Sequence, residues 1–433
     1  MTTMERNDKL PASLEALIGQ VSDRLGDQPK RAAIFANCLE NTWNTTLERL
    51  EDGTTFVITG DIPAMWLRDS AAQIRPYLLA ANGDPEVANV IEGLIERQLR
   101  FVLLDPYANA FNEAPNGRGH TSDLTEMNPS VWERKYEIDS LCYPIQLAYL
   151  FWKNTGRTSV FNETFRQALQ AIIRLWKTEQ HHETLSTYRF QRLNCPETDT
   201  LVREGKGAIT AFTGMTWSGF RPSDDACTYG YLVPSNMFAV VVLRYAAEIA
   251  RDVLGEEELA RQSTELAGVI EQGIREHAIV EHSTYGRIYA YETDGLGHHH
   301  FMDDANVPSL MSAPYLGYCP IDDPVYINTR NFVLSAGNPY YFEGKAAAGI
   351  GSPHTPENYI WPIALAMQGL TSGSQEERER LLDLLESTDA GCGMMHEGFH
   401  KDDPEQYTRE WFSWANMMYC ELVMQSVGLR VAV

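Results

Sequence analysis

The segment at residues 59–70 reads TGDIPAMWLRDS and passes from a turn directly into a helix. Its glycine and proline are turn residues, and the apolar spacing that follows predicts a helix from residue 66 onward. At the start of that helix the segment places an aromatic plane, Trp66, beside a guanidinium, Arg68, and a carboxylate, Asp69. One interpretation is an ordinary helix start with Trp66 in the core. The other is a binding site built on the first turn of a helix, and the rest of the chain favours it.

Three further segments carry the same mixture of aromatic, acidic and basic side chains. They are WERKYEID at residues 132–139, WSGFRPSDD at residues 217–225 and WFSWAN at residues 411–416. A hexose ring has an apolar face on which Trp can stack and a rim of hydroxyls that Arg and Asp can hydrogen-bond. Because four such clusters occur in one chain, we predict that they share one sugar-binding cleft.

Length and charge narrow the class of protein. The chain has 433 residues without a Pro/Gly/Ser-rich linker or a low-complexity tract, so we predict a single domain over residues 1–433. Thirty-five basic residues against 59 acidic ones give a formal net charge of −24. Such a surface repels phosphate groups, which argues against nucleic acid and against an anionic membrane as partners. A neutral substrate fits this charge.

Targeting features point to the cytoplasm. Residues 1–10 lack the basic start and apolar core of a signal peptide, and no later run is long and apolar enough to span a bilayer. We therefore expect a cytoplasmic protein without membrane contact. The seven cysteines are scattered and never in CxxC spacing, which predicts reduced thiols rather than a disulfide framework.

Helical periodicity dominates the chain and predicts an all-α fold. Paired helices separated by long loops fit an α/α toroid, in which inner helices surround a pit and the loops line its mouth, because no fixed repeat length supports a solenoid. Small β-hairpins are expected at residues 54–58 and 287–291. The predicted helices cover residues 12–26, 30–50, 66–81, 86–104, 136–153, 160–180, 235–253, 256–276, 356–370, 375–387 and 409–428, and the long loops cover residues 105–135, 181–234, 277–352 and 389–408.

Hydrolysis of a glycosidic bond needs one carboxylic acid to protonate the leaving oxygen and a second carboxylate on the other side of the sugar. Asp224 and Asp225 lie side by side in RPSDDA, residues 221–226, and a neighbouring like charge raises the pKa of one carboxyl, as a general acid requires. The alternative is that this Ser-Asp-Asp run only caps a helix. Glu397, in the glycine-bounded loop GMMHEGFH at residues 393–400, is the candidate base.

Four further carboxylates are rivals for these roles. Each lies in or beside one of the aromatic clusters, so each can act as acid, as base or as a partner of sugar hydroxyls. Spacing alone does not rank Asp69, Glu137, Asp139 and Glu410.

Three consecutive histidines at residues 298–300 raise the question of a metal site. Metal-binding histidines normally sit at i, i+2 or i, i+4 so that two rings face one ion, and three in a row cannot all converge. We therefore predict no metal but a loop that lines the sugar site, with Asp303, Asp304 and Asn306 as hydroxyl partners. The chain has no GxGxxG, P-loop or GxSxG motif, which gives no support to a dinucleotide, phosphoryl-transfer or serine-hydrolase reading.

Five segments together resemble glycoside hydrolase family 125, the metal-independent exo-α-1,6-mannosidases, over essentially the whole chain. The resemblance implies an (α/α)6 barrel, no cofactor, and a mannose-containing oligosaccharide as substrate. It also implies an inverting reaction in which Asp224 or Asp225 is the general acid and Glu397 activates water. The five segments, in order, are GDIPAMWLRDS (60–70), ERKYEIDS (133–140), FRPSDD (220–225), MDDANVPSL (302–310) and MHE (395–397).

The resemblance also implies which residues hold the substrate. Arg68 and Asp69 would grip the terminal mannose, and further residues would stack on it or line the pit. These further candidates are Trp66, Glu137, Asp139, Asp304 and Asn306.

Two other functions stay open on the same architecture. A sugar epimerase or isomerase would use histidine as acid and base, and His354, His396 and the run at residues 298–300 are available for that. A non-catalytic carbohydrate-binding protein would need no carboxylate that activates water.

Overall fold

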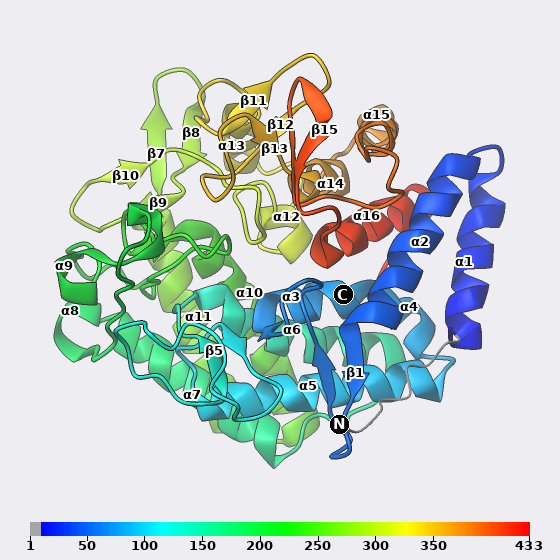
Figure 1. Cartoon of the computed structure of the whole chain (residues 1–433). Coiled ribbons are helices and arrows are strands. Elements are labelled where there is room, and N and C mark those ends of the chain that lie inside the picture. Colours follow the sequence, from blue (N-terminus) through cyan, green and yellow to red (C-terminus); the bar gives the residue numbers. More distant parts are fainter. Residues whose placement is uncertain (1–9) are drawn as a thin grey trace.

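The computed structural model describes residues 10–433, and helices make up most of its regular structure (Figure 1). Residues 1–9, which carry most of the signal-peptide argument, lie outside the described residues. Within residues 10–433 no helix is both long enough and apolar enough to cross a bilayer. The longer helices are α1 (Ala12–Leu25), α2 (Pro29–Thr46), α3 (Leu67–Ile74), α5 (Pro85–Leu104), α6 (Ile138–Thr155), α7 (Glu163–Glu179), α10 (Val233–Ile249), α11 (Glu257–His277), α13 (Pro324–Val333), α14 (Pro362–Leu370), α15 (Gln375–Ser387) and α16 (Ser413–Ser426). The short helical segments are η1 (Arg75–Tyr77), α4 (Leu78–Ala81), α8 (His182–Leu185), η2 (Glu197–Asp199), α9 (Val202–Gly205), η3 (Ala250–Leu254) and α12 (Ala313–Leu316).

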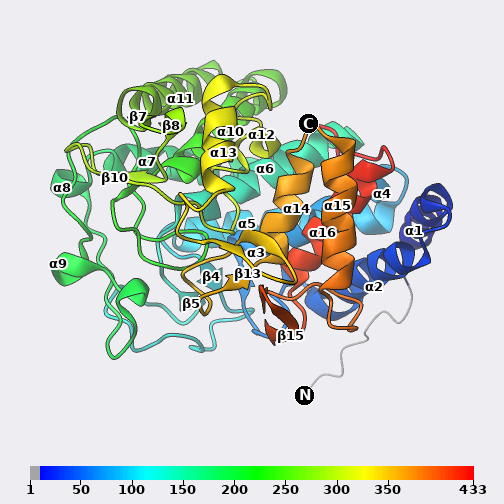
Figure 2. The ribbon, with the colours of Figure 1, turned by 90° about the horizontal axis from the view of Figure 1, so that it is seen from above.

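The helices form an inner and an outer layer. In the inner layer α3 packs against α6 and α16, α6 against α10, and α16 against α14, while the short α12 packs against α10. In the outer layer α5 packs on α6, α11 on α10, α15 on α14 and α2 on α16. Figure 2, seen from above, shows α14, α15 and α16 side by side. The chain alternates between the layers, as the predicted helix pairs require.

Apolar patterning explains the two layers. α10 reads VPSNMFAVVVLRYAAEI and is buried over most of its surface, as expected for a helix that is apolar almost all round. α7 buries a single stripe that includes Phe165, Leu169, Ile172 and Trp176, and its other face is polar. An inner helix therefore has packing partners on several sides, whereas an outer helix covers the core with one face.

The strands are short, and three small antiparallel sheets lead into inner helices. Their strand orders are β3-β4-β5, β10-β9-β6 and β13-β14-β15, with β3 preceding α3, β6 preceding α10 and β13 preceding α14. Three hairpins, β1-β2, β7-β8 and β11-β12, complete the strands of the described residues. The strands are β1 (Leu47–Arg49), β2 (Thr55–Val57), β3 (Met65–Trp66), β4 (Ala110–Phe111), β5 (Val131–Glu133), β6 (Tyr231–Leu232), β7 (Ile279–His282), β8 (Gly286–Tyr289), β9 (Glu292–Thr293), β10 (His299–His300), β11 (Tyr341–Glu343), β12 (Ala348–Ile350), β13 (Tyr359–Ile360), β14 (Gly398–His400) and β15 (Asp403–Thr408).

The structure confirms both predicted hairpins, since β2 pairs with β1 and β8 pairs with β7. Three helix boundaries are wrong. The helix predicted at residues 30–50 ends at Thr46, because Leu47 is extended and pairs with Val57. The helix predicted from residue 356 begins only at Pro362, because strand β13 occupies residues 359–360. The helix predicted from residue 409 begins at Ser413, since residues 409–412 link the end of β15 at Thr408 to α16.

Helix α13 was missed, because it falls in a stretch predicted to be a loop, residues 277–352. Its start carries a readable signal: the side chain of Asp323 caps the helix by accepting from the backbone N–H of Tyr326, and Pro324 occupies the first turn. Pro76 also interrupts the helix predicted at residues 66–81, which has a 3-10 turn there.

Candidate active site

A cavity with about 450 Å³ of empty space lies at the N-terminal ends of inner helices α3, α14 and α16. Three of the four predicted clusters, at residues 59–70, 217–225 and 411–416, contribute to its wall, which confirms the shared cleft for these three. The fourth, at residues 132–139, lies behind the wall. The lining residues are Thr59, Ile62, Trp66, Arg68, Asp69, Pro222, Ser223, Asp224, Asn306, His354, Trp361, Glu397, Arg409, Phe412 and Trp414.

The sheet β3-β4-β5 assembles one side of the site. Trp66 at the end of β3 pairs with Ala110 of β4, and the backbone N–H of Leu67 donates to the carbonyl of Asn109 at 3.1 Å. Strand β5 then pairs with β4 and leads through residues 134–137 into α6. Arg68 is thereby held beside Asn109 and Glu137, although these three residues are far apart in the chain.

The sheet β13-β14-β15 assembles the other side. Glu397 directly precedes β14, and Arg409 directly follows β15, so the pairing of these two strands brings the two side chains together. Trp361 follows β13 and opens α14. A short sheet thus positions a carboxylate, a guanidinium and an aromatic ring at one end of the inner helices.

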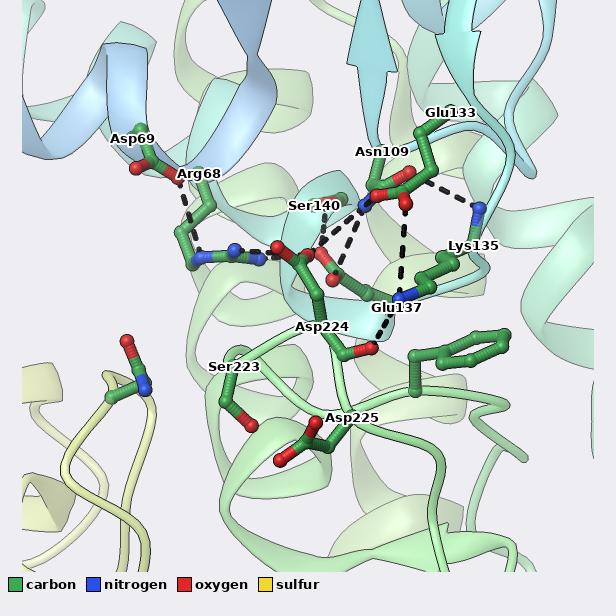
Figure 3. Close-up of polar contacts among 12 residues, drawn as sticks. Arg68, Asp69, Asn109, Glu133, Lys135, Glu137, Ser140, Ser223, Asp224 and Asp225 are labelled. Carbon is green, nitrogen blue, oxygen red and sulfur yellow. Dashed lines mark hydrogen bonds and ion pairs between the residues drawn. The ribbon is translucent and has the colours of Figure 1, made fainter. Parts of the chain in front are cut away.

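Arg68 is the centre of the charge arrangement, and its side chain is only 3% exposed. Its Nη1 lies 2.5 Å from Glu137 Oε2 and 3.5 Å from Asp139 Oδ2. Its Nη2 lies 3.4 Å from Asp224 Oδ1, and its Nε lies 3.5 Å from Asp69 Oδ2. One guanidinium therefore contacts four carboxyl groups, of which Figure 3 shows those of Asp69, Glu137 and Asp224.

Asp224 and Asp225 are neighbours in sequence but point in different directions (Figure 3). Asp224 has a positive φ of 67°, and its Oδ1 accepts from Asn109 Nδ2 at 3.2 Å and faces Arg68. Asp225 instead has its Oδ1 3.4 Å from His354 Nδ1. Of the two aspartates, Asp224 is the one that lines the cavity. The run does not cap a helix, because residues 221–226 form a turn closed by pairing of Phe220 with Ala226.

The expectation that two adjacent aspartates raise the pKa of one of them is wrong for Asp224. Burial would raise the pKa of Asp224, but Arg68, Lys135 and a hydrogen bond from Glu137 together lower it below its ordinary value. The raised pKa belongs to Glu137: its complete burial raises it well above the ordinary value, against the opposing charge of Arg68, and Asp224 and Asp139 add to the rise. The pKa that neighbouring carboxylates raise is thus that of Glu137, which lies in a different segment from Asp224.

Burial also raises the pKa of Asp69 and of Asp139, each to about 6 against the opposing charge of Arg68. Asp139 additionally accepts from Ser235 Oγ at 3.1 Å. The cluster around Arg68 therefore releases some of its protons only near neutral pH.

Glu397 lines the cavity together with two basic side chains, Arg409 and His354. Arg409 Nη1 lies 3.4 Å from Glu397 Oε1, and Arg409 also pairs with Asp61. Burial would lower the pKa of His354, but its hydrogen bond to Asp225 and the neighbouring carboxylates, Glu397 among them, raise it to about 9. His354 is therefore a cation at neutral pH.

The remaining predicted residues divide between the cavity and the layer behind it. Trp66 and Asn306 line the cavity, as predicted. Asp304 is buried behind it, where it accepts from Ser223 Oγ at 2.8 Å. The side chains of Glu137 and Asp139 are also fully buried behind the wall rather than in it.

Several rival candidates lie away from the cavity. Glu410 is exposed, and its backbone carbonyl contacts His396 Nδ1 at 2.6 Å. His298 pairs with Asp294 at 2.6 Å, and neither it nor the next two histidines lines the cavity. Asp303, predicted as a hydroxyl partner, instead accepts from the backbone N–H groups of residues 310 and 311.

Unpartnered polar atoms mark the cavity as a binding site. Thr59 Oγ1, Trp66 Nε1 and Trp414 Nε1 are buried and have no hydrogen-bond partner within residues 10–433. All three belong to lining residues. Buried polar groups in proteins are normally satisfied, so a polar ligand that supplies hydroxyl groups is the natural partner for these atoms.

Sequence reasoning missed four residues that matter for this site: Asn109, Lys135, Arg409 and Trp361. Lys135 and Arg409 lie in or beside the aromatic clusters, so the clusters themselves were a usable signal. Asn109 gave none, because it stands alone before β4 and reaches the site only through the pairing of β3 with β4.

Aromatic rings and three carboxyl groups, those of Asp69, Asp224 and Glu397, in one cavity of a two-layered helical fold are the features of a glycosidase site. The fold is similar to that of a bacterial glucoamylase solved in complex with acarbose, with a TM-score of 0.61 over 92% of this chain and 56% of that chain. The identity in that comparison is 15%, so the likeness concerns the fold alone.

Closer relatives identify the family. The pattern of the metal-independent α-mannosidases (GH125) matches residues 28–424. A Streptococcus pneumoniae protein from a family of metal-independent α-mannosidases, solved as a non-productive complex with α-1,6-mannobiose, is 52% identical, with a TM-score of 0.95 over 96% of this chain and 99% of that chain. The meiotically up-regulated gene 157 protein of Schizosaccharomyces pombe is 40% identical over 435 residues, covering 95% of this chain and 85% of that protein. The chain belongs to GH125, the metal-independent α-mannosidases, and is a glycoside hydrolase.

Proposed function

We propose that this protein removes terminal α-1,6-linked mannose from manno-oligosaccharides with inversion of configuration, with Asp224 as general acid and Glu397 as general base. The observation that carries the proposal is that both carboxyl groups line one cavity from different loops. Asp225 is not chosen, because its carboxyl group faces His354. The 52% identical relative bound to α-1,6-mannobiose supports this linkage.

In the proposed reaction Asp224 gives a proton to the glycosidic oxygen while the bond from that oxygen to the anomeric carbon breaks. Glu397 takes a proton from the water that attacks the anomeric carbon from the other face. The sugar is released as β-mannose. An inverting pair needs about 6.5–9.5 Å between its carboxyl groups to leave room for this water, and we expect that separation here.

The fold and the cavity support removal of one terminal sugar at a time. We infer an (α/α)6 barrel with α3, α6, α10, α12, α14 and α16 inside and α2, α5, α7, α11, α13 and α15 outside. The cavity then lies at the N-terminal ends of the inner helices, where the helix dipoles favour negative charge. About 450 Å³ of empty space, open mouth included, suits the end of a sugar chain, from which we infer exo action.

The test compares three variants on α-1,6-, α-1,2- and α-1,3-mannobiose in the presence of EDTA. We expect release from the α-1,6 dimer, and a loss of about 10²–10⁴-fold in kcat/KM for Asp224→Asn and for Glu397→Gln. Asp225→Asn, the matched neighbour, should lose much less. Asp224→Asn should also recover on 2,4-dinitrophenyl α-mannoside, because this leaving group needs no acid.

Near wild-type turnover in Asp224→Asn or in Glu397→Gln would refute the assigned roles. A loss in Asp225→Asn that equals the loss in Asp224→Asn would remove the choice between the two aspartates. Release from the α-1,2 or α-1,3 dimer at the same rate would remove the linkage specificity.

A further inference from the structure

The carboxyl groups around Arg68 outnumber the cations that balance them. Asp69, Glu137, Asp139 and Asp224 lie within 3.5 Å of its guanidinium nitrogens. Fully ionised, these four groups would leave a net charge of −3 on a buried cluster, which is strongly unfavourable. At least one proton must therefore stay in the cluster at working pH.

Lys135 does not remove this surplus. Its ammonium donates to the backbone carbonyl of Asp224 at 2.7 Å rather than to the carboxylate. It also pairs with Asp199 and lies 3.7 Å from Glu133, two further carboxylates. The charge of Lys135 acts on Asp224 but is shared with Asp199 and Glu133, which are not part of the cluster.

Glu137 and Asp224 lie side by side in the cluster, because both accept from Asn109 Nδ2, at 3.5 and 3.2 Å, and both face the guanidinium of Arg68. A hydrogen bond between two carboxyl groups requires a proton on one of them. The side chain of Glu137 is 0% exposed, whereas that of Asp224 is 22% exposed and faces the cavity. The neutral acid is favoured at the more buried position, so the proton rests on Glu137 while the cavity is empty of substrate.

We propose that Glu137 and Asp224 form a carboxyl dyad in which Glu137 stores the proton that Asp224 delivers to the leaving group. This inference rests on the proposed role of Asp224 as the general acid. Glu137 does not line the cavity, so it acts through Asp224 as a positioning and proton-supplying residue. It is not a sugar ligand.

The proton balance of a turnover closes without any further reactant. The dyad gives one proton to the glycosidic oxygen, and Glu397 takes one from the attacking water. When the products leave, Glu397 returns its proton to solvent. The dyad regains one through the exposed side of Asp224, and this proton moves on to Glu137.

The groups that face Glu137 set how firmly it holds the proton. Arg68 on α3 favours its ionised form from 2.5 Å, and Ser140 on α6 donates to its Oε2 at 2.8 Å. Asn109, before β4, is 3.5 Å from its Oε1. Asp139 on α6, Asp224 in its loop and the burial of the side chain favour the neutral form, and they prevail, because the pKa of Glu137 is raised well above its ordinary value.

The principal test is Glu137→Gln, measured on two substrates. The amide of glutamine can donate to Asp224 but cannot supply a proton, so Asp224 becomes a fixed carboxylate. We expect kcat/KM on α-1,6-mannobiose to fall about 10²–10⁴-fold. We also expect the alkaline limb of its pH profile to move to lower pH, and activity on 2,4-dinitrophenyl α-mannoside to be largely kept. Equal losses on both substrates with an unchanged pH profile would overturn the dyad and leave Glu137 a structural residue.

Ser140→Ala is a second variant, and it should shift the alkaline limb of the pH profile in the opposite direction. It removes a donor that stabilises the carboxylate form of Glu137, so the alkaline limb should move to higher pH, and the small truncation keeps the test available if Glu137→Gln does not fold. No shift of that limb in a folded Ser140→Ala protein would contradict the proton store.

The matched control is Glu421→Gln, which removes a different buried carboxylate paired with a buried arginine, Arg75. It should change stability but leave the pH profile in place, and a shift of the profile like that of Glu137→Gln would assign the effect to general destabilisation.

Asp224→Asn separates the two proposals. If Asp224→Asn behaves as an acid variant but Glu137→Gln is like wild type, the dyad alone fails. If Asp224→Asn is itself fully active, the proposed function fails.

Discussion

Two buried arginines, seven residues apart on one inner helical segment, differ in the number of carboxyl groups that surround them. Arg68 is on α3 and contacts four carboxyl groups, whereas Arg75, two turns further along, has a single carboxylate partner within residues 10–433, Glu421 at 3.4 Å. Arg75 also stacks on Tyr315 at 4.2 Å, and the hydroxyl of Tyr315 donates to Glu421 at 3.0 Å. The pair around Arg75 is balanced in charge, and the cluster around Arg68 is not.

This difference distinguishes a buried ion pair that stabilises the fold from a cluster that can take part in catalysis. A one-to-one buried pair such as Arg75 and Glu421 holds helices together and carries no surplus of carboxyl groups. A surplus of carboxyl groups raises pKa values and keeps exchangeable protons, which is what acid catalysis needs. The surplus lies at the cavity, and the balanced pair lies elsewhere on the same helical segment.

The largest effect should come from Arg68→Met, which leaves four carboxyl groups without their cation. We expect a loss of about a thousandfold in kcat/KM, because the charge that orients Asp224 is gone. Arg68 also lowers the pKa of Asp69 and of Asp139, now about 6 each, so both values should rise further in the variant. A folded-state pKa above the unfolded one adds stability that is lost as pH rises through it. The Tm of the variant should therefore fall further below that of wild type at pH 8 than at pH 5. An equal fall at both pH values would contradict an excess of carboxyl groups around Arg68.

Glu421→Gln is the corresponding break of the balanced pair. Removing one partner leaves the buried charge of Arg75 uncompensated, which costs about 3–5 kcal/mol in the free energy of unfolding. The double variant Arg75→Met with Glu421→Leu should recover most of this loss, since an apolar replacement of a whole buried pair is often neutral. Urea unfolding measures both. The activity of the folded protein should change little, and a large loss of kcat/KM would show that the two arginines are not functionally distinct.

Asp139→Asn reduces the surplus by one group while the hydrogen bond from Ser235 can be kept. Asp139 titrates at about 6, against about 3.9 in the unfolded chain, so its stabilising contribution is complete below pH 4 and is lost as pH rises through 6. The variant lacks this loss. It should gain about 1–2 kcal/mol over wild type at pH 8 and nothing at pH 4, the gain being limited because an amide N–H then faces Arg68. Chemical unfolding at the two pH values measures it, and a variant less stable than wild type at pH 8 would contradict the account.

The smallest effect concerns the adjacent aspartates, of which Asp225 forms its own one-to-one pair with His354. In Asp225→Asn the pKa of His354 should fall from about 9 toward its ordinary value of about 6.5. The stability that this pair contributes is complete below pH 6.5 and is lost as pH rises through 9, so the variant should lose that part of the pH dependence. The change in Tm should be small, because the side chain of His354 is 40% exposed. An NMR titration of His354 checks the shift, and an unchanged pKa would rule out the pairing.

The sequence predicted the helical layers and three of the four converging clusters, because both follow from local patterns. Apolar periodicity separates the inner helix α10 from an outer helix such as α7, and turn residues mark where the loops begin. It failed at the helix end near residue 50 and at the helix start near residue 356, where strand pairing overrides helical spacing. Such pairing is a long-range event, and local spacing does not report it.

The sequence predicted which residue types form the site, but not which of them line the cavity and which lie buried behind its wall. Trp66, Arg68, Asp224 and Glu397 were found in sequence and do line one cavity. That Glu137 lies behind the wall could not be read from sequence, since its place depends on how β5 pairs with β4 and turns into α6. For the same reason the carboxyl partner of Asp224 was sought at Asp225 and is found at Glu137.

The most direct test of the account is the anomer first released from α-1,6-mannobiose, followed by proton NMR in the presence of EDTA before mutarotation. Proton delivery by Asp224 and attack by a water held by Glu397 on the other face predict β-mannose as the first product, with activity retained without metal. Release of α-mannose would contradict the central claim, because it requires a covalent intermediate or attack from the same face as the leaving group.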